Sequence, residues 1–531
     1  MTLTRRGVIR LAGGAAIVAP LATACGNGGG AGGDNSNEGS TGRLLESAAP
    51  LPEPFGVALP IPPVLEPVST DGGTDHYEIT QRAAEIEILP GLRTEVWGYN
   101  GIFPGPTIVS RSNRPVAVTH RNELPVPVVV HLHGGKTPPE HDGYPTDMIL
   151  PAGGPAPSGH ESHGGQSVPL GDTSDGTRVY EFPLEQPAAT LWYHDHRMDF
   201  TGPQVYRGLA GFHIVHDDVE DALPLPTGDR DVPLMICDRA FEEDGAFAYP
   251  SLDPGLQGEP GVENPYMSGV LGDVILVNGA PWPHMEVTGT RYRFRILNAS
   301  NARRYKLALD PPPAEGAAFT QIGSDAGLLG APVELDDIEA APAERFDVVV
   351  DFSAYPIDSE VTLVNAFGED GTAQVMRFRV VEEADDDTEI PDRLADFETL
   401  ARADAVATRR VRFAREAANP GGGGNLWTIN GETFDPDRVD FEPALGSTEV
   451  WRITTNVHHP VHLHLAHFQV LSRDGGDPGP YDAGWKDTID LRDGEEAEIL
   501  VRFTGYPGRY VYHCHNLEHE DMMMMANFTV V

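Results

Sequence analysis

Short apolar runs separated by turn residues recur along most of the chain, and few stretches repeat apolar residues at the spacing of a helix. Residues 116–119 (Val-Ala-Val-Thr) and 126–130 (Val-Pro-Val-Val-Val) are examples, and 213–215 (His-Ile-Val) closes the first series of such runs. Runs of this length, bounded by Gly, Pro, Asn and Asp, are typical of β-strands joined by short turns. The 59 glycines and 47 prolines agree with this, so the pattern predicts an all-β protein.

Two polar segments divide the strand-rich sequence into three blocks. Residues 217–226 are acidic and contain prolines, and residues 382–387 form a charge run that we expect to be solvated. A chain of 531 residues is also too long for a single core. We therefore predict three Greek-key β-sandwich domains, at 51–218, 219–388 and 389–531.

The first 24 residues are predicted to be a signal peptide. The segment around Arg5 and Arg6 resembles a twin-arginine export signal, and the apolar stretch 11–24 that follows has the length of a signal peptide rather than of a membrane span. We therefore expect export to the cell surface or the extracellular space.

Two endings of this signal compete. Residues 22–24 (Ala-Thr-Ala) form a small-residue cleavage site, whereas 21–25 (Leu-Ala-Thr-Ala-Cys) resemble a lipobox with an imperfect third position. The segment 25–50 begins rich in glycine and is predicted to be a flexible tether, which is useful mainly when something is anchored. This favours a lipid anchor at Cys25, with simple cleavage as the alternative.

The charge balance is strongly acidic, because 80 Asp and Glu against 37 Lys and Arg give a formal net charge of −43. This excludes nucleic acid as a partner, since a polyanion requires a basic surface. The cysteines (Cys25, Cys237 and Cys514) are too few to predict a disulfide framework. Cys237 lies in the apolar run 232–237 and is expected to be a buried structural thiol.

Histidines occur in pairs with one residue between the members. Residues i and i+2 of a strand point to the same face, so each pair presents two imidazoles in one direction. Zinc or a single copper ion cannot use eight imidazoles, whereas three copper ions with two or three histidines each can. The four pairs are His131 and His133, His194 and His196, His462 and His464, and His513 and His515.

The last pair brackets Cys514, so the sulfur points away from both neighbouring rings. A thiolate, two imidazoles and a weakly bound thioether form the trigonal blue-copper ligand set, which is suited to one-electron transfer. His519 and Met524 follow closely in sequence, and His459 offers the second imidazole. One strand would therefore serve two metal sites, with Cys514 linked covalently to ligands of the second.

These motifs resemble those of the multicopper oxidases, most closely the branch of bacterial spore-coat laccase, bilirubin oxidase and phenoxazinone synthase. The resemblance covers about residues 50–531, and all the ligand residues are present. The matching segments are 131–137, 191–196, 459–464, 484–488 and 513–521.

The resemblance implies three cupredoxin domains and four copper ions, one of type 1, one of type 2 and two of type 3. The type 1 ion would lie in the third domain, and the other three ions would form a cluster between the first and third domains. Dioxygen would be reduced to water with electrons from a small aromatic reductant. In this family the type 2 ion would be held by His131 and His462, one type 3 ion by His133, His194 and His515, and the other by His196, His464 and His513.

Two carboxylates match residues that supply protons to the cluster in this family. Asp142 follows His133 by nine residues, and its alternative role is that of a turn residue before Gly143. Glu520 is next to His519 and matches the acid on the side where oxygen is released. The alternative for Glu520 is a solvated carboxylate or one that only supports a ligand.

Phenols and aromatic amines are the expected reductants of a monomeric enzyme, with electrons entering through an exposed ligand edge such as that of His459. Bilirubin-like tetrapyrroles, aminophenols and cuprous ions are alternatives. A copper nitrite reductase is disfavoured, because it needs no type 3 histidine pairs. A non-catalytic copper-binding protein with the cupredoxin fold is disfavoured as well, because no ligand has been lost.

The anchor can be tested by fractionation. If Cys25 is lipidated, the mature protein should sediment with membranes, and Cys25→Ala should release it into the soluble exported fraction. One acyl chain binds membranes with only about 10⁴ M⁻¹, so stable retention requires more than one chain. Wild-type protein found wholly in the soluble exported fraction, with residue 25 unmodified, would establish simple cleavage instead.

Overall fold

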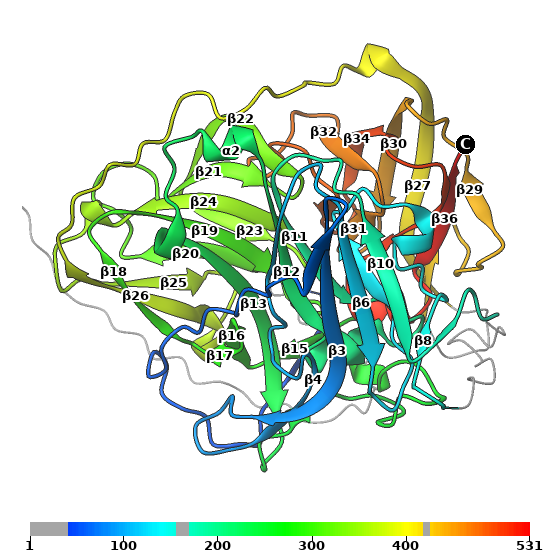
Figure 1. Cartoon of the computed structure of the whole chain (residues 1–531), viewed down its shortest axis with the longest axis horizontal. Helices are drawn as coiled ribbons and strands as arrows, with labels where there is room; N and C mark the ends of the chain where they lie inside the picture. The colour runs from blue at the N-terminus through cyan, green and yellow to red at the C-terminus, as the bar shows by residue number, and fades with distance from the viewer. Residues whose placement is uncertain (1–40, 155–168, 418–424) are drawn as a thin grey trace, which may run out of the picture. The chain divides into compact units, whose positions relative to one another are not determined.

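The computed structural model describes residues 41–154, 169–417 and 425–531, and β-strands make up most of its regular structure (Figure 1). The predicted signal peptide, Cys25 and the first part of the predicted tether lie outside the described residues. No helix among the described residues has the length and apolar character needed to cross a membrane. The prediction of an all-β fold is confirmed.

The first block contains two sheets. The five-stranded sheet has the order β10 (Thr177–Phe182), β6 (Val116–Asn122), β3 (Thr74–Ile86) and β2 (Ser69–Asp71), with β4 (Thr94–Tyr99) paired to β3. The four-stranded sheet has the order β5 (Ile108–Arg111), β12 (Ala210–His216), β11 (Ala189–Asp195) and β7 (Val130–His133). Tyr180 and Phe182 of β10 are buried while Val179 is 44% exposed, which is the alternation of a half-buried strand.

The second block contains a larger pair of sheets. One has the order β17 (Ala280–Pro281), β16 (Val274–Val277), β13 (Asp231–Phe241), β19 (Arg291–Asn298), β24 (Arg345–Asp351), β21 (Phe319–Ser324) and β22 (Gly327–Leu335), with β14 (Phe247–Ala248) on β13. The other has the order β18 (His284–Thr288), β26 (Gln374–Glu382), β25 (Glu360–Asn365), β20 (Tyr305–Asp310) and β23 (Asp337–Ala340). Cys237 of β13 is buried and unpaired, as expected, and burial raises its pKa to about 11.

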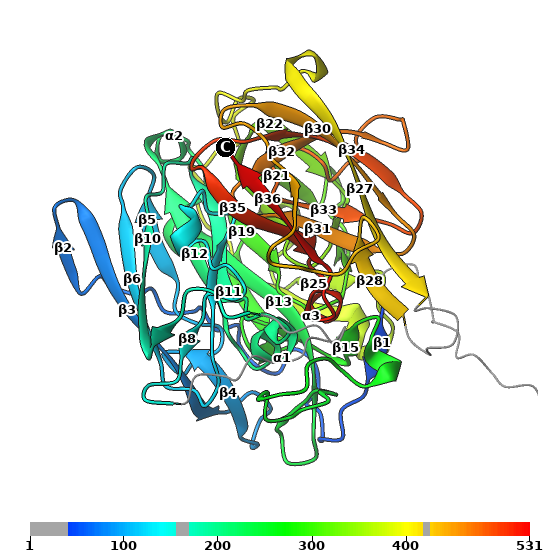
Figure 2. The same cartoon turned by 90° about the vertical axis from the view of Figure 1, so that its right-hand side faces the viewer.

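The third block contains two five-stranded sheets. The first has the order β28 (Asn425–Ile429), β27 (Ala405–Ala417), β30 (Thr448–Thr455), β34 (Glu496–Arg502) and β32 (His467–Arg473). The second has the order β29 (Val439–Phe441), β36 (Met525–Val530), β35 (Gly508–Cys514), β31 (His459–Leu463) and β33 (Thr488–Leu491), and Figure 2 shows β31 beside β35. Its apolar core includes Trp451, Tyr512 and Cys514.

Short elements complete the described chain. A two-stranded sheet pairs β8 (Ile149–Leu150) with β9 (Ser174–Asp175). The α-helices are α1 (Thr201–Tyr206), α2 (Asp218–Asp221) and α3 (Leu517–Asp521). The 3-10 helices are η1 (Pro139–His141), η2 (Gly228–Arg230), η3 (Asn264–Tyr266), η4 (Phe352–Ala354), η5 (Asp370–Ala373) and η6 (Arg402–Asp404).

The end of the predicted tether is ordered. β1 (Arg43–Leu45) pairs in parallel with β15 (Val270–Gly272) of the second block. Ser47 reinforces this attachment, because its main-chain N–H and its hydroxyl donate to the two oxygens of Asp273 at 2.8 and 2.5 Å. Backbone groups of β15 and the Asp273 carboxylate thus hold residues 43–47 in place, although composition alone indicated that this segment would be flexible.

Both predicted linkers are also partly folded. Asp217 caps α2, which carries the buried Glu220 against Arg293 and Arg295. Asp386, in the second linker, accepts from the Arg291 main-chain N–H at 2.8 Å and pairs with Arg230. Asp386 is therefore fixed by arginines of the second block, whereas the other carboxylates of the charge run are exposed, as expected. The domain boundaries remain predictions.

Candidate metal centres

Strand register brings the histidine pairs together two by two. In the first block His131 of β7 stands opposite His194 of β11. In the third block His462 of β31 stands opposite His513 of β35. Because neighbouring strands pair side by side, rings carried on adjacent strands at matched positions share one face.

The two blocks meet at these rings. The imidazoles of His131 and His464 stack with ring centroids 3.8 Å apart, and those of His133 and His462 stack at 3.7 Å. The nitrogens Nε2 of His196 and His464 both approach Nε2 of His513, at 3.2 and 3.3 Å. All eight imidazoles from the four pairs therefore belong to one cluster between the first and third blocks.

Several rings in this cluster have a nitrogen with no hydrogen-bond partner among the described residues. Their opposite ring nitrogens mostly bond to main-chain oxygens or carboxylates, which fixes which nitrogen carries the proton. Among the described residues, the nitrogens without a hydrogen-bond partner include His131 Nε2, His133 Nδ1, His194 Nε2, His462 Nε2 and both nitrogens of His515.

This arrangement fits copper ions. Burial lowers the pKa of His131, His133 and His515 well below the ordinary value, so these rings are neutral and their lone pairs are free. A buried acceptor without a partner is costly, and several aimed at one another would be rare without a cation between them. Neutral imidazole is a preferred ligand of copper, so the donor set and the geometry agree.

A second group has the composition of a blue-copper site. His459 Nδ1 and His519 Nδ1 lie 3.3 and 3.5 Å from Cys514 Sγ and 3.2 Å from each other. Burial raises the pKa of the Cys514 thiol, so a thiolate here needs a cation beside it. The main-chain N–H of Asn516 points at Cys514 Sγ, at 3.4 Å, and favours the thiolate.

Met524 shares the apolar core of Cys514, whereas Met523 and Met525 belong to another cluster. Strand alternation does not cause this separation, because the backbone is not extended at Met523. Met523 has φ +76°, and the Met524 N–H donates to the His519 carbonyl at 3.1 Å. The end of α3 therefore turns Met524 toward the Cys514 side before β36 begins.

The expected exposed ligand edge is absent. His459 and His519 are both 0% exposed. The Trp427 ring stacks on His519 with centroids 3.6 Å apart, and the Ser268 carbonyl accepts a hydrogen bond from His519 Nε2 at 3.2 Å. An aromatic ring of the third block and a loop of the second block thus cover the His519 imidazole, and the His459 edge that was expected at the surface is buried.

Asp142 lies against the cluster rather than in an exposed turn. Its carbonyl accepts from His131 Nδ1 at 2.6 Å, and its Oδ2 lies 2.7 Å from His464 Nδ1. Burial raises the pKa of Asp142 well above its ordinary value. Its Oδ1 has no hydrogen-bond partner among the described residues, which leaves one oxygen available to carry a proton.

Glu520 lies beside two rings that Asp142 does not contact, those of His196 and His513. Its Oε1 is 3.5 Å from His196 Nδ1, and its Oε2 is 3.5 Å from His513 Nδ1. The Thr201 hydroxyl donates to Oε1 at 2.7 Å. Burial raises the pKa of Glu520 to about 8, and the carboxyl is not solvated.

Sequence reasoning assigned no role to Asp487, although it noted the segment 484–488. Asp487 Oδ1 lies 3.0 Å from His133 Nε2, and its main-chain oxygen accepts from His462 Nδ1 at 2.9 Å. The available signal was that Asp487 lies within the matched segment 484–488. His458, by contrast, bonds to Asp490 and is a neighbour of the site.

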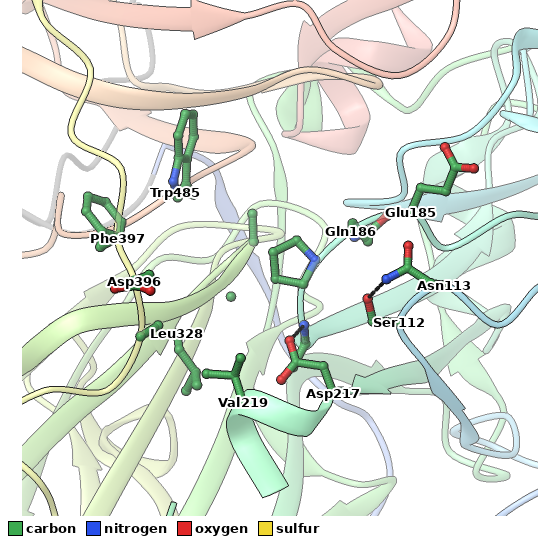
Figure 3. Close-up of a pocket in the computed structure, with 15 residues that line it drawn as sticks. Ser112, Asn113, Glu185, Gln186, Asp217, Val219, Leu328, Asp396, Phe397 and Trp485 are labelled. Atoms are coloured by element: carbon green, nitrogen blue, oxygen red, sulfur yellow. Dashed lines mark hydrogen bonds between the residues drawn. The ribbon is translucent and has the colours of Figure 1, made fainter. Parts of the chain in front are cut away.

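A cavity of about 440 Å³ lies beside the segment that contains Asp487 (Figure 3). Trp485 and Phe397 lie on one side of it, with ring centroids 6.3 Å apart, and Glu185 and Gln186 lie on the other. None of the predicted ligands lines this cavity. It is therefore separate from both groups of ligand atoms.

Comparisons with known proteins agree with this geometry. Two family models described as multicopper oxidase match residues 407–531 and residues 80–155 with 166–220. A laccase from Bacillus subtilis (strain 168) is 38% identical over 525 residues, covering 89% of this chain and 98% of that protein. A bilirubin oxidase from Albifimbria verrucaria is 33% identical over 527 residues, covering 92% of this chain and 84% of that protein.

Solved structures share the fold. The crystal structure of laccase from Pediococcus acidilactici Pa5930 has a TM-score of 0.77 and 32% identity, covering 92% of this chain and 96% of that chain. The fold prediction and the family resemblance are thereby confirmed. The chain belongs to the multicopper oxidase family and is a laccase-like, copper-dependent enzyme that uses dioxygen.

Proposed function

We propose that the twelve matched residues hold four copper ions and that small phenols or aromatic amines supply the electrons for dioxygen reduction. The observation that carries this proposal is the convergence of eight buried imidazoles from two blocks, several with free lone pairs. Cys514 ends β35, the strand that carries His513, and His515 follows it directly, which supports the coupling of the two sites.

The type 1 ion would be held by His459, Cys514 and His519, with Met524 as a weak axial ligand. Three donors about 2 Å from one ion, at trigonal angles, would lie about 3.5 Å apart. The separations of 3.2 to 3.5 Å among the three donor atoms support this assignment.

The cluster ions would divide the other eight histidines. The close approach of Nε2 atoms supports a shared ion for His196, His464 and His513. His131 and His462 belong to one group whose ligand atoms lie within 4.8 Å of one another. By the family pattern, the type 2 ion would be held by His131 and His462, one type 3 ion by His133, His194 and His515, and the other by His196, His464 and His513.

Bound copper would supply one-electron chemistry at the first site and multi-electron reduction of dioxygen at the second. The chain's own contribution begins with Cys514, whose covalent bonds to His513 and His515 form the shortest path between the sites. Burial of all these groups excludes water from that path.

Asp142 and Glu520 would provide protons. Each carboxyl is buried, has a raised pKa and lies against ligand rings at an atom that is not aimed into the cluster. A raised pKa favours the protonated carboxyl, which can pass its proton to a base that forms nearby. The two carboxyls contact different rings, so each can serve a different side of the cluster.

The reductant is proposed to react without binding to the metal. Because the type 1 histidines are covered, an electron must cross Trp427 or the segment at Ser268, and such transfer tolerates several donors. Phenols and aromatic amines are favoured by the laccase relatives. A tetrapyrrole such as bilirubin is the second candidate, supported by the bilirubin oxidase relative, and cuprous ion is the third. Oxygen uptake with a substrate panel distinguishes the three.

Export by the twin-arginine signal, with a lipid anchor at Cys25, remains our proposal for the location of the enzyme. Its support is the paired Arg5 and Arg6 and the cysteine that follows the apolar stretch. A monomer is proposed for the folded enzyme.

Copper content and Cys514→Ser test the two-site assignment. Wild-type protein matured with excess copper should contain four ions per chain and show an intense blue band. Cys514→Ser should lose the blue band, bind about three ions and stop oxidising phenols, because the cluster histidines are unchanged. A wild-type content near one or two ions, or phenol oxidation by the variant, would contradict the assignment.

Asp142→Asn tests proton supply. The amide retains an acceptor for His464 but has no proton to give, so oxygen reduction should slow by about 10²-fold while the blue band and copper content are kept. Because the pKa of Asp142 is raised, the wild-type rate should fall as pH rises and the carboxyl loses its proton. This fall should be missing in the variant. Equal turnover of both proteins across the pH range would return Asp142 to a purely structural role.

Met524→Leu tests the axial ligand. Loss of a weak donor disfavours the oxidised ion more, so the reduction potential of the blue site should rise while copper and colour are retained. Met523→Leu and Met525→Leu are matched controls, because both side chains pack in another cluster. A redox titration in which either control moves the potential, while Met524→Leu does not, would show that the wrong methionine was assigned.

A further inference from the structure

One arginine of the second block reaches the cluster that the other two blocks form. Arg345, the first residue of β24, is 0% exposed. A guanidinium has five N–H donors, and all five are used here. Nε donates to Thr190 O at 3.0 Å, Nη1 to Ala343 O at 2.9 Å and Asp487 Oδ1 at 2.8 Å, and Nη2 to Asp325 O at 2.8 Å and to Asp487 Oδ2.

The acceptors of Arg345 come from all three blocks. Thr190 lies on β11, the strand that carries His194 in the first block. Asp487 directly precedes β33 in the third block, beside the ligand strand β31. The planar guanidinium therefore sets the distance between three parts of the chain at one point, which a flexible cation would not do.

Asp487 passes this constraint to two ligands. Its Oδ1 accepts from His133 Nε2, and its main-chain oxygen accepts from His462 Nδ1. The hydrogen bonds leave His133 Nδ1 and His462 Nε2 without partners among the described residues. The two rings, which stack on each other, thus present different nitrogens to the cluster. The Thr488 hydroxyl lies 3.2 and 3.3 Å from the same two nitrogens, and Asp487 supplies the charged side chain and the carbonyl that accept from them.

The Asp487 carboxylate is held in place by its neighbours. The Arg345 guanidinium donates to both of its oxygens. Asp325 Oδ2 lies 3.2 Å from the main-chain N of Asp487 and 3.2 Å from Lys486 Nζ. The Asp487 side chain, its main-chain N–H and the preceding Lys486 are therefore all fixed.

Gly134 shows how closely this pair approaches the ligand strand. It follows His133 and has φ +85°. A Cβ at this position would lie 2.8 Å from Arg345 Nη2 and 2.9 Å from Asp487 Oδ2. Only glycine leaves room for the ion pair against the backbone beside the ligand.

We propose that Arg345 is a positioning residue of the second block, which sets the orientation and the protonated nitrogen of His133 and His462 through Asp487. This inference rests on the proposed function, because it concerns ligands of the cluster ions. A purely structural ion pair is the competing explanation, and the chain supplies a matched control for it.

The control is Arg295, which is 1% exposed and equally dependent on a carboxylate fork. Its Nε and Nη2 donate to the two oxygens of Asp231, each at 2.8 Å, and Nη2 also reaches Glu220. Its Nη1 donates to the Thr190 hydroxyl at 3.3 Å, so the two arginines share Thr190 but not Asp487. None of these partners contacts any of the twelve proposed ligands. Lysine at either position keeps the charge but loses the fork.

The experiment compares Arg345→Lys with Arg295→Lys in copper-loaded protein. Both variants should lower thermal stability. Arg345→Lys alone should change the hyperfine splitting of the type 2 copper signal in electron paramagnetic resonance and release cluster copper to a chelator about 10- to 100-fold more readily. The blue band should be unchanged in both, because the type 1 ligands do not touch Asp487.

Two further measurements test the proposal even if Arg345→Lys fails to fold. Asp487→Asn keeps an acceptor for His133 but turns an NH₂ group toward the guanidinium, so it should give the same change in the type 2 signal. In copper-free wild-type protein, ¹⁵N resonances of the histidines should show the proton on Nε2 of His133 and on Nδ1 of His462. The reverse tautomer at either ring would overturn the proposal.

The outcomes separate the two levels of inference. If wild-type protein binds fewer than four copper ions, the proposed function fails. If it binds four ions, and Arg345→Lys and Asp487→Asn leave the type 2 signal and copper retention no different from Arg295→Lys, then only the role of Arg345 is refuted.

Discussion

The rest of the structure depends on the burial of neutral imidazoles whose free nitrogens face one another. Nitrogens such as His131 Nε2, His194 Nε2 and His462 Nε2 have no hydrogen-bond partner among the described residues. In an apolar interior such groups are costly, and without metal they would be expected to turn away or attract water. The fold must therefore fix each ring through its other nitrogen, and the groups that bond to that nitrogen must themselves be rigid.

Main-chain oxygens provide most of that support. The carbonyls of Asp142, Asp195, Asp487 and Cys514 accept from Nδ1 of His131, His194, His462 and His513 respectively. Several of these carbonyls belong to strands or flank them, so their positions follow from the β-ladders and not from side-chain rotamers. An all-β scaffold suits this purpose, because two ladders from different blocks can present paired rings to one another.

The second block contributes no proposed ligand, yet it contacts both sites. Arg345 holds Asp487 behind two cluster rings, and Ser268 bonds to His519 at the other site. Ser268 and Trp427 together close the blue-copper group to solvent. This cover favours electron transfer through protein over direct contact with a reductant.

The sequence by itself determined the all-β class and the identity of the proposed ligands, because both depend on local geometry. A spacing of two residues puts His462 and His464 on one face of any strand, and peptide bonds join Cys514 to its neighbours whatever the fold. Tertiary structure alone decided which distant groups support them: Arg345 and Asp487 are 142 positions apart. It also decided the pairing of β1 with β15, the left-handed Met523 and the cover over His459. These features depend on contacts between segments that no local pattern relates, so only packing brings them together.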